Sequence, residues 1–362
     1  MTLSTLGTLV TRADTTPSSP KRLRLTGNPA KMADVAQDDR PVSRRGSLAY
    51  PNAGERPLTT RLKTGIQLPE VEYVASWQQH LDMARLAEDI GLDSLWLGDH
   101  LLYTYPDEPA RGPWECLTML SALAASTARI ELGPLVLSTS FRNPAMTAKI
   151  AETIDEISGG RFILGLGAGW NRSEYDAFGF PYDRRFARFA EAFEIIRSLV
   201  RTGQVDFEGE FYSAQECQIV PRGPSAGSMP IMVGSTGEKM LRLTLPHVDL
   251  WNIWYADFGN SVDGLRPHLD RLDALCVEVG RDPAEIGRTA AILVTAPGGS
   301  TRSSGATRER HASGISGTPE DVATHLLAFR DVGIGHIQIV LDPITPQAIE
   351  WLAPAIERVR QG

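Results

Sequence analysis

From residue 62 onward, segments with a strand pattern alternate with segments with a helix pattern, about eight times in roughly 300 residues. Short apolar runs precede stretches in which apolar residues recur every three or four positions, which is the order of a β/α repeat. This count and length predict an eight-fold parallel β/α barrel with insertions, whose active site lies where the strands end. A doubly wound parallel sheet is the alternative, but no glycine-rich fingerprint follows the first strand.

The boundaries follow from these periods and from glycine, proline and capping residues. The predicted strands are 62–68, 94–97, 130–138, 162–166, 230–233, 248–254, 289–296 and 336–341, and the predicted helices are 77–90, 115–128, 144–157, 186–200, 238–245, 265–279, 319–332 and 347–360. Asn143 and Pro144 suit a helix start, and Gly159 suits a helix end. Residues 205–212 interrupt the alternation and predict a hairpin around Gly209.

The first 61 residues differ from the rest of the chain in charge and composition. They hold ten Lys and Arg against five acids, whereas the remainder carries a net charge of −13 and the whole chain −8. They show no sustained period and are rich in Ser, Thr, Pro and Arg, so we expect a disordered extension before a barrel domain over 62–362. A targeting peptide and a start at Met32 are alternatives, although no apolar stretch follows Arg44-Arg45.

Composition also narrows the functional class. The acidic body argues against a nucleic-acid enzyme, and the chain has no run of about 18 apolar residues that would predict a membrane span. The three cysteines are far apart, which indicates a reducing cytoplasm and buried thiols rather than disulfides. The seven histidines have no ligand spacing, so no metal site is expected.

Polar and glycine residues cluster at the predicted strand ends. The second strand ends in Asp99-His100, where a histidine can move a proton and Asp99 can orient it; a structural pair at the barrel rim is the alternative. The third ends in Ser138, Thr139 and Ser140, whose hydroxyls can bind a planar ring, with Arg142 able to face an anion. Asn143 is expected to cap the next helix in either case.

Two glycine turns complete this edge. Gly165, Gly167 and Gly169 remove side chains where the fourth strand ends, and Asn171 can cap the following helix, so a flat or anionic ligand can approach the backbone. Tight packing of strand on helix is the alternative. The segment Gly234-Ser235-Thr236-Gly237 forms a second cradle, suited to phosphate. The long polar loop 297–317 predicts a mobile lid or plain disorder.

These stretches carry a resemblance to a known family. Trp96 to His100, 158–180, 207–212 and 230–237 resemble the bacterial-luciferase-like oxidoreductases, which comprise flavin monooxygenases and enzymes of the deazaflavin coenzyme F420. The resemblance implies a β/α barrel with the ring at the strand ends, near Asp99 and His100. It also implies a cis peptide bond near Ser138–Thr139, ring contacts from Ser138, Thr139, Gly167, Ala168, Gly169 and Asn171, and phosphate contacts from Gly234 to Gly237.

One position departs from the pattern of the family's sugar-phosphate dehydrogenases. A glutamate that serves as acid follows the glycine turn in those enzymes, whereas Trp170 stands here and suits stacking on an apolar or aromatic substrate. The resemblance favours coenzyme F420 and hydride transfer to a small organic substrate. An FMN-dependent monooxygenase, supplied by a flavin reductase, and a non-catalytic flavin-binding barrel are the alternatives. It also implies a homodimer that pairs through the early helices.

Overall fold

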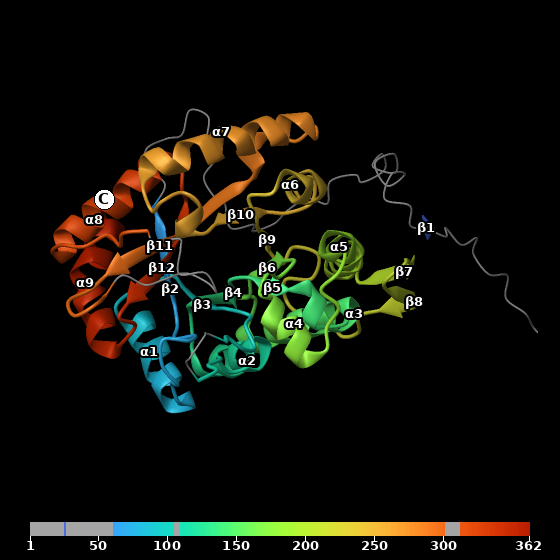
Figure 1. The fold of residues 1–362 in the computed structure, drawn as a ribbon, viewed down its shortest axis with the longest axis horizontal. Coiled ribbons are helices and arrows are strands. Elements are labelled where there is room, and N and C mark those ends of the chain that lie inside the picture. Colours follow the sequence, from blue (N-terminus) through green and yellow to red (C-terminus); the bar gives the residue numbers. More distant parts are fainter. Residues whose placement is uncertain (1–24, 27–60, 105–108, 301–311) are drawn as a thin grey trace, which may run out of the picture.

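The computed structural model describes residues 25–26, 61–104, 109–300 and 312–362, and in these residues one sheet of nine parallel strands curls into a nearly closed barrel (Figure 1). Its strands, in the order in which they pair around the barrel, are β4 (Glu131–Pro134), β3 (Ser94–Leu97), β2 (Lys63–Gln67), β12 (His336–Asp342), β11 (Gly287–Thr295), β10 (Leu250–Ile253), β9 (Ile231–Gly234), β6 (Leu164–Gly167) and β5 (Leu137–Ser138). The barrel prediction is confirmed, and the open doubly wound sheet is excluded.

The ninth strand arises because the predicted strand 130–138 is divided in two. A cis peptide bond between Leu135 and Val136 separates β4 from β5. β4 pairs with β3, β5 pairs with β6, and a bridge between Leu132 and Phe162 brings β4 next to the start of β6. Together β4 and β5 therefore fill one position, and the barrel has the predicted eight positions.

Helices cover the outside of the barrel, close to their predicted bounds (Figure 1). They are α1 (Trp77–Asp89), α2 (Cys116–Ser126), α3 (Pro144–Ser158), α5 (Arg185–Thr202), α6 (Glu238–Thr244), α7 (Val262–Glu278), α8 (Pro319–Asp331) and α9 (Pro346–Gln361), with a short additional helix, α4 (Arg172–Phe178). The caps explain the bounds of α3: the Asn143 side chain accepts hydrogen bonds from the backbone of Ala145 and Met146, and Gly159 ends the helix with a φ of 68°.

The hydrophobic core has two parts. The larger lies between strands and helices, and a smaller cluster of Trp96, Ile163, Met232 and Leu250 contains side chains from four barrel strands or their starts. The Trp96 indole donates to Ser94 Oγ at 2.7 Å, and Ser94 Oγ lies 2.7 Å from His336 Nε2. Cys116 and Cys276 are buried, as predicted, whereas Cys217 is only partly buried. None of the described helices has the length and apolar character needed to cross a membrane.

The predicted hairpin around Gly209 is confirmed outside the barrel. Strands β7 (Gln204–Glu208) and β8 (Ser213–Gln218) pair antiparallel, and β1 (Leu25–Thr26) pairs with β7. Of residues 1–61, the structure describes only the two residues of β1 and Arg61. The prediction of a disordered extension therefore falls on positions outside the described residues. Most of the predicted lid, residues 301–311, also lies outside them.

Candidate active site

His100, directly after β3, lies between two buried carboxylates. Its Nδ1 is 3.1 Å from both carboxylate oxygens of Glu174, and its Nε2 is 3.7 Å from Glu70 Oε1. Glu174 comes from α4 and its side chain is 1% exposed, while that of His100 is 19% exposed. The histidine is therefore held by buried groups on one side and remains accessible on the other.

The two carboxylates control the protonation of His100. Burial of the ring lowers the pKa of His100, but the charge of Glu70, together with the hydrogen bond and charge of Glu174 and the charge of Asp99, outweighs burial and raises the pKa above its usual value. The imidazole thus keeps its proton at a higher pH than an unperturbed histidine does. A partly exposed histidine in this state can serve as a general acid.

Glu70 is itself fixed over the end of β3. Its Oε2 accepts a hydrogen bond from Gln67 Nε2 at 2.8 Å, and its Oε1 accepts one from the Tyr103 hydroxyl at 2.8 Å. A Cβ at Gly98 would lie 2.6 Å from Glu70 Oε2, so the glycine provides the space for this carboxylate. The chain segments that follow β2 and β3 are thereby joined.

Asp99, expected to orient His100, is hydrogen-bonded to other groups in the structure. Its two oxygens accept hydrogen bonds from both terminal nitrogens of Arg142, each at 2.7 Å, and from the backbone nitrogen of Ser138 at 2.8 Å. Arg142, expected to face an anion, is paired with Asp99 and also with Glu115. The pair joins the ends of β3 and β5, and Glu174 takes the expected place of Asp99 beside His100.

The cis peptide bond is the second correction. It lies between Leu135 and Val136, three residues before the expected Ser138–Thr139 position. Ser138 Oγ lies 3.1 Å from the Tyr175 hydroxyl, which donates to the Ala168 carbonyl at 2.7 Å. Thr139 is 2% exposed, and its hydroxyl has no hydrogen-bond partner within the part of the chain that the structure describes; the Ser140 hydroxyl is in the same state.

The glycines of β6 and β9 accommodate Val136. A Cβ at Gly167 would lie 2.8 Å from Val136 Cγ2, one at Gly234 3.0 Å from the same atom, and one at Gly165 3.0 Å from Val136 Cγ1. At Gly169 the φ is +69°, and a Cβ would lie 2.3 Å from the Tyr175 hydroxyl. These glycines therefore serve packing at least in part, since Gly165, Gly167 and Gly234 make room for Val136 and Gly169 makes room for Tyr175.

Two further expected cofactor contacts are Asn171 and the turn 234–237, and the structure shows the first engaged with other groups of the chain and the second open. Asn171 is the N-cap residue of α4, but its side chain makes no capping hydrogen bond: its Nδ2 donates to the Leu102 carbonyl at 2.9 Å, and its Oδ1 accepts from Ser173. The segment Gly234 to Gly237 leads from β9 into α6 and is open. A Cβ at Gly237 would meet only Ser235 Oγ, at 3.6 Å. This turn can admit a ligand to the backbone.

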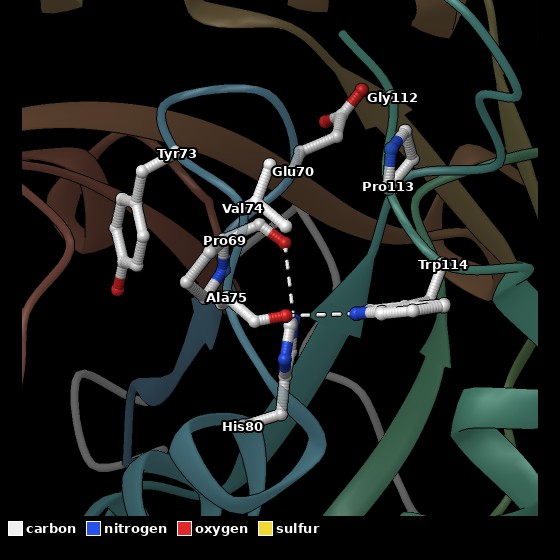
Figure 2. A pocket seen from close by; sticks show the side chains of 9 residues that line it. All are labelled: Pro69, Glu70, Tyr73, Val74, Ala75, His80, Gly112, Pro113 and Trp114. Atoms are coloured by element: carbon white, nitrogen blue, oxygen red, sulfur yellow. Dashed lines mark hydrogen bonds between the residues drawn. The ribbon is translucent and has the colours of Figure 1, made fainter.

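Trp170 borders His100 and is 46% exposed. Its ring centroid lies 5.5 Å from that of His100 and 6.3 Å from that of Tyr103. Glu70 also lines a cavity of about 160 Å³ (Figure 2). Val74 and Trp114 line it as well, and the Trp114 indole donates to the Ala75 carbonyl at 2.8 Å. The aromatic rings of Trp170 and Tyr103 thus lie beside the histidine.

The sequence interpretation brought together His100, Ser138 and the glycine turns but missed Glu70, Tyr103 and Glu174 as site residues. Glu70 follows a barrel strand by three residues, so the rule that sites lie at strand ends could have found it. Within the described ranges, no group of three or more His, Cys, Asp or Glu side chains is placed to hold a metal ion.

The barrel carries a histidine, buried carboxylates and an open glycine turn at its strand ends. This combination is typical of β/α-barrel enzymes that bind a ligand at that edge. The family model of luciferase-like monooxygenases matches residues 58–304, and the chain belongs to this family of oxidoreductases.

The curated relatives represent both branches of the family. The chain is 38% identical over 159 residues to 5,10-methylenetetrahydromethanopterin reductase of Archaeoglobus fulgidus, covering 44% of each protein. It is 32% identical over 247 residues to pyrimidine monooxygenase RutA of Methylorubrum populi, covering 67% of this chain and 60% of the relative. It is 34% identical over 177 residues to F420-dependent glucose-6-phosphate dehydrogenase of Amycolatopsis mediterranei, covering 46% and 52%. The chain spans roughly half the length of such relatives.

Solved structures share the fold. An F420-dependent secondary alcohol dehydrogenase in complex with an F420–acetone adduct superposes with a TM-score of 0.69 at 17% identity, covering 83% of this chain and 99% of that one. Monooxygenase RslO1 from Streptomyces bottropensis superposes with a TM-score of 0.64 at 21% identity, covering 83% and 98%. At these identities the likeness concerns the fold alone.

Proposed function

We propose that this protein is a coenzyme F420-dependent oxidoreductase that transfers a hydride between the deazaflavin and a small organic substrate. The observation that carries the proposal is His100, partly exposed and held between Glu70 and Glu174 at the strand ends. When bound, the deazaflavin carries hydride and does not activate oxygen. A hydride transfer to or from a carbonyl carbon needs a proton moved at the oxygen, and His100 can hold that proton.

The donors around the site fit a planar ring with a phosphorylated tail. The Thr139 and Ser140 hydroxyls are buried without partners in the described chain, as expected of groups that a ligand completes. The backbone at Gly237 is open at the start of α6, where amide hydrogens favour an anion. In this proposal Thr139 and Ser140 face the ring and 234–237 the phosphate.

The raised pKa of His100 suits the part of general acid in a reduction. A larger fraction of such an imidazole is in the acid form at a given pH, ready to give a proton to a developing alkoxide. The exposed Trp170 replaces the acid of the sugar-phosphate enzymes, so we favour an apolar or aromatic carbonyl compound as substrate.

An FMN-dependent monooxygenase is the second candidate. The observation in its favour is that the match to pyrimidine monooxygenase RutA extends over 247 residues, further than the match to the F420-dependent relative. A partner reductase would then have to supply reduced flavin. We therefore propose a flavin reductase as partner in this case, or a deazaflavin reductase if the cofactor is F420.

Titration of the purified protein with F420 and with FMN, followed by fluorescence quenching, tests the choice of cofactor. We expect F420 to bind more tightly, and tighter binding of FMN would overturn the assignment. Thr139→Val then tests the site: a lost hydrogen bond should weaken binding about 5- to 10-fold, whereas thermal stability should not fall because the hydroxyl has no hydrogen-bond partner among the residues that the structure describes. Thr153→Val, on the exposed side of α3, is the matched control.

We further propose a cytoplasmic homodimer that pairs through the early helices. Met146 and Ile157 on α3 are 55% and 43% exposed, which is consistent with a covered apolar face. Met146→Glu should lower the molar mass measured by light scattering from that of a dimer to that of a monomer. A monomeric wild-type protein would contradict the proposal.

A further inference from the structure

The start of α4 departs from ordinary helix capping. Asn171 is the N-cap and Glu174 the third helical residue, a position from which a glutamate commonly bonds back to the N-cap nitrogen. Here both side chains leave the helix and contact the segment after β3. Glu174 Oε1 accepts from the backbone nitrogens of Leu101 at 2.6 Å and Leu102 at 3.2 Å, and Asn171 donates to the Leu102 carbonyl.

The two oxygens of Glu174 have different surroundings. Both oxygens lie 3.1 Å from His100 Nδ1, but Oε1 also receives the two backbone N–H groups, whereas Oε2 faces Nδ1 without them. A carboxylate only accepts hydrogen bonds, so Nδ1 must carry the proton of this bond. Nε2 lies 3.7 Å from Glu70 Oε1, too far for a hydrogen bond, and is thus the ring nitrogen without a hydrogen bond in the described chain.

We propose that Glu174 is a positioning residue that holds His100 as the Nδ1–H tautomer and thereby leaves Nε2 as the atom that exchanges a proton with the substrate. This inference rests on the proposed function for the identity of the reaction but not for the tautomer. A carboxylate that sets both the tautomer and the orientation of a catalytic imidazole is a recurring arrangement in enzymes.

Other charged and titratable groups also face the ring. Glu70 comes from the loop after β2, Asp99 precedes His100 in the chain, and the Tyr103 ring centroid lies 4.6 Å from that of His100. Glu70 Oε1 lies on the Nε2 side of the ring but beyond hydrogen-bond distance, and Asp99 acts on the ring through its charge. In the described chain Glu174 is the carboxylate within hydrogen-bond distance of a ring nitrogen, so we assign the choice of tautomer to Glu174.

The ¹⁵N chemical shifts of the His100 ring in the free protein test this directly. His100→Asn assigns the signals. Above its pKa, wild-type His100 should show a protonated Nδ1 and an unprotonated Nε2. In Glu174→Gln the amide oxygen can still accept from Leu101 and Leu102, which turns the amide nitrogen toward Nδ1. The tautomer should then reverse, and the titration midpoint should fall by about 1–3 pH units.

Activity gives a second readout once a substrate is known. Glu174→Gln should lower kcat by about 10²-fold with little change in KM, and the His100 limb of the pH profile should move to lower pH. Glu191→Gln is the matched control, because Glu191 also accepts hydrogen bonds from three backbone nitrogens, those of Glu210, Phe211 and Tyr212, and none of them belongs to a histidine. That control should leave the His100 shifts unchanged.

An Nε2–H tautomer in the wild-type protein would overturn the inference, and so would a Glu174→Gln variant that loses stability with unchanged His100 shifts. The wild-type spectrum decides even if the variant does not fold. Because these spectra are recorded without cofactor, failure of the inference is distinguishable from failure of F420 to bind.

Discussion

Replacement of Asp99 by Asn separates a structural from a chemical role at the end of β3. Asp99 is 3% exposed, and its carboxylate receives two hydrogen bonds from Arg142 and one from the backbone of Ser138. An asparagine keeps one acceptor oxygen, but its amide nitrogen has to face a donor of the guanidinium. The positive charge of Arg142 then remains half-buried with Glu115 as its remaining acid.

The expected loss follows from this geometry. Removal of one partner of a buried ion pair costs about 3–5 kcal/mol, and the contact between Arg142 and Glu115 places the expected value near the lower end, about 3 kcal/mol. For a domain of this size, about 2–3 °C of melting temperature corresponds to 1 kcal/mol, so Asp99→Asn should melt about 6–9 °C lower than the wild type.

Differential scanning calorimetry with ring ¹⁵N shifts of His100 on the same sample is the assay. Asp176→Asn is the control, because Asp176 pairs with Arg172 on the surface, where the two side chains are 61% and 69% exposed, and should change stability by no more than about 0.5 kcal/mol. We expect the Asp99 variant to keep the His100 tautomer and most of its turnover per folded molecule. Unchanged stability with a lost tautomer would refute the structural reading and restore Asp99 as the group that orients His100.

Three further expectations follow from the same contacts. Gly237→Val should weaken cofactor binding and leave the melting temperature unchanged. Gly167→Val should lower both the cofactor affinity and the melting temperature, because its Cβ would lie 2.8 Å from Val136. Equal melting temperatures of the two variants would contradict this packing. The folded-state pKa of His100 is raised, so its contribution to stability is complete below about pH 6.5 and is lost as the pH rises through the folded pKa. Urea unfolding of the wild type and His100→Asn should therefore show a difference that shrinks with rising pH, and a growing difference would contradict the sign. A chain that begins at residue 58, where the family match starts, should keep its melting temperature and cofactor affinity, and a large loss of either would show that the preceding residues contribute.

Most element positions were accessible from the sequence because their signals are local. Periodic apolar residues predicted α5, whose Phe189, Phe193 and Ile196 are buried, and Asn143 and Gly159 predicted the ends of α3. The division of β4 from β5 and the position of the cis peptide bond were not accessible. The family resemblance implied such a bond near Ser138–Thr139, but no residue type marks Leu135, since neither it nor Val136 is followed by proline.

The sequence by itself determined the number and order of the barrel units, the family pattern and the position of His100 at a strand end. The tertiary structure decided which groups act on that histidine. Glu174 is 74 residues away from it along the chain, and Arg142, which takes Asp99, is 43 residues from Asp99. Local periodicity carries no information on such pairs, because they exist only when the closed barrel brings the ends of separate strands to one rim.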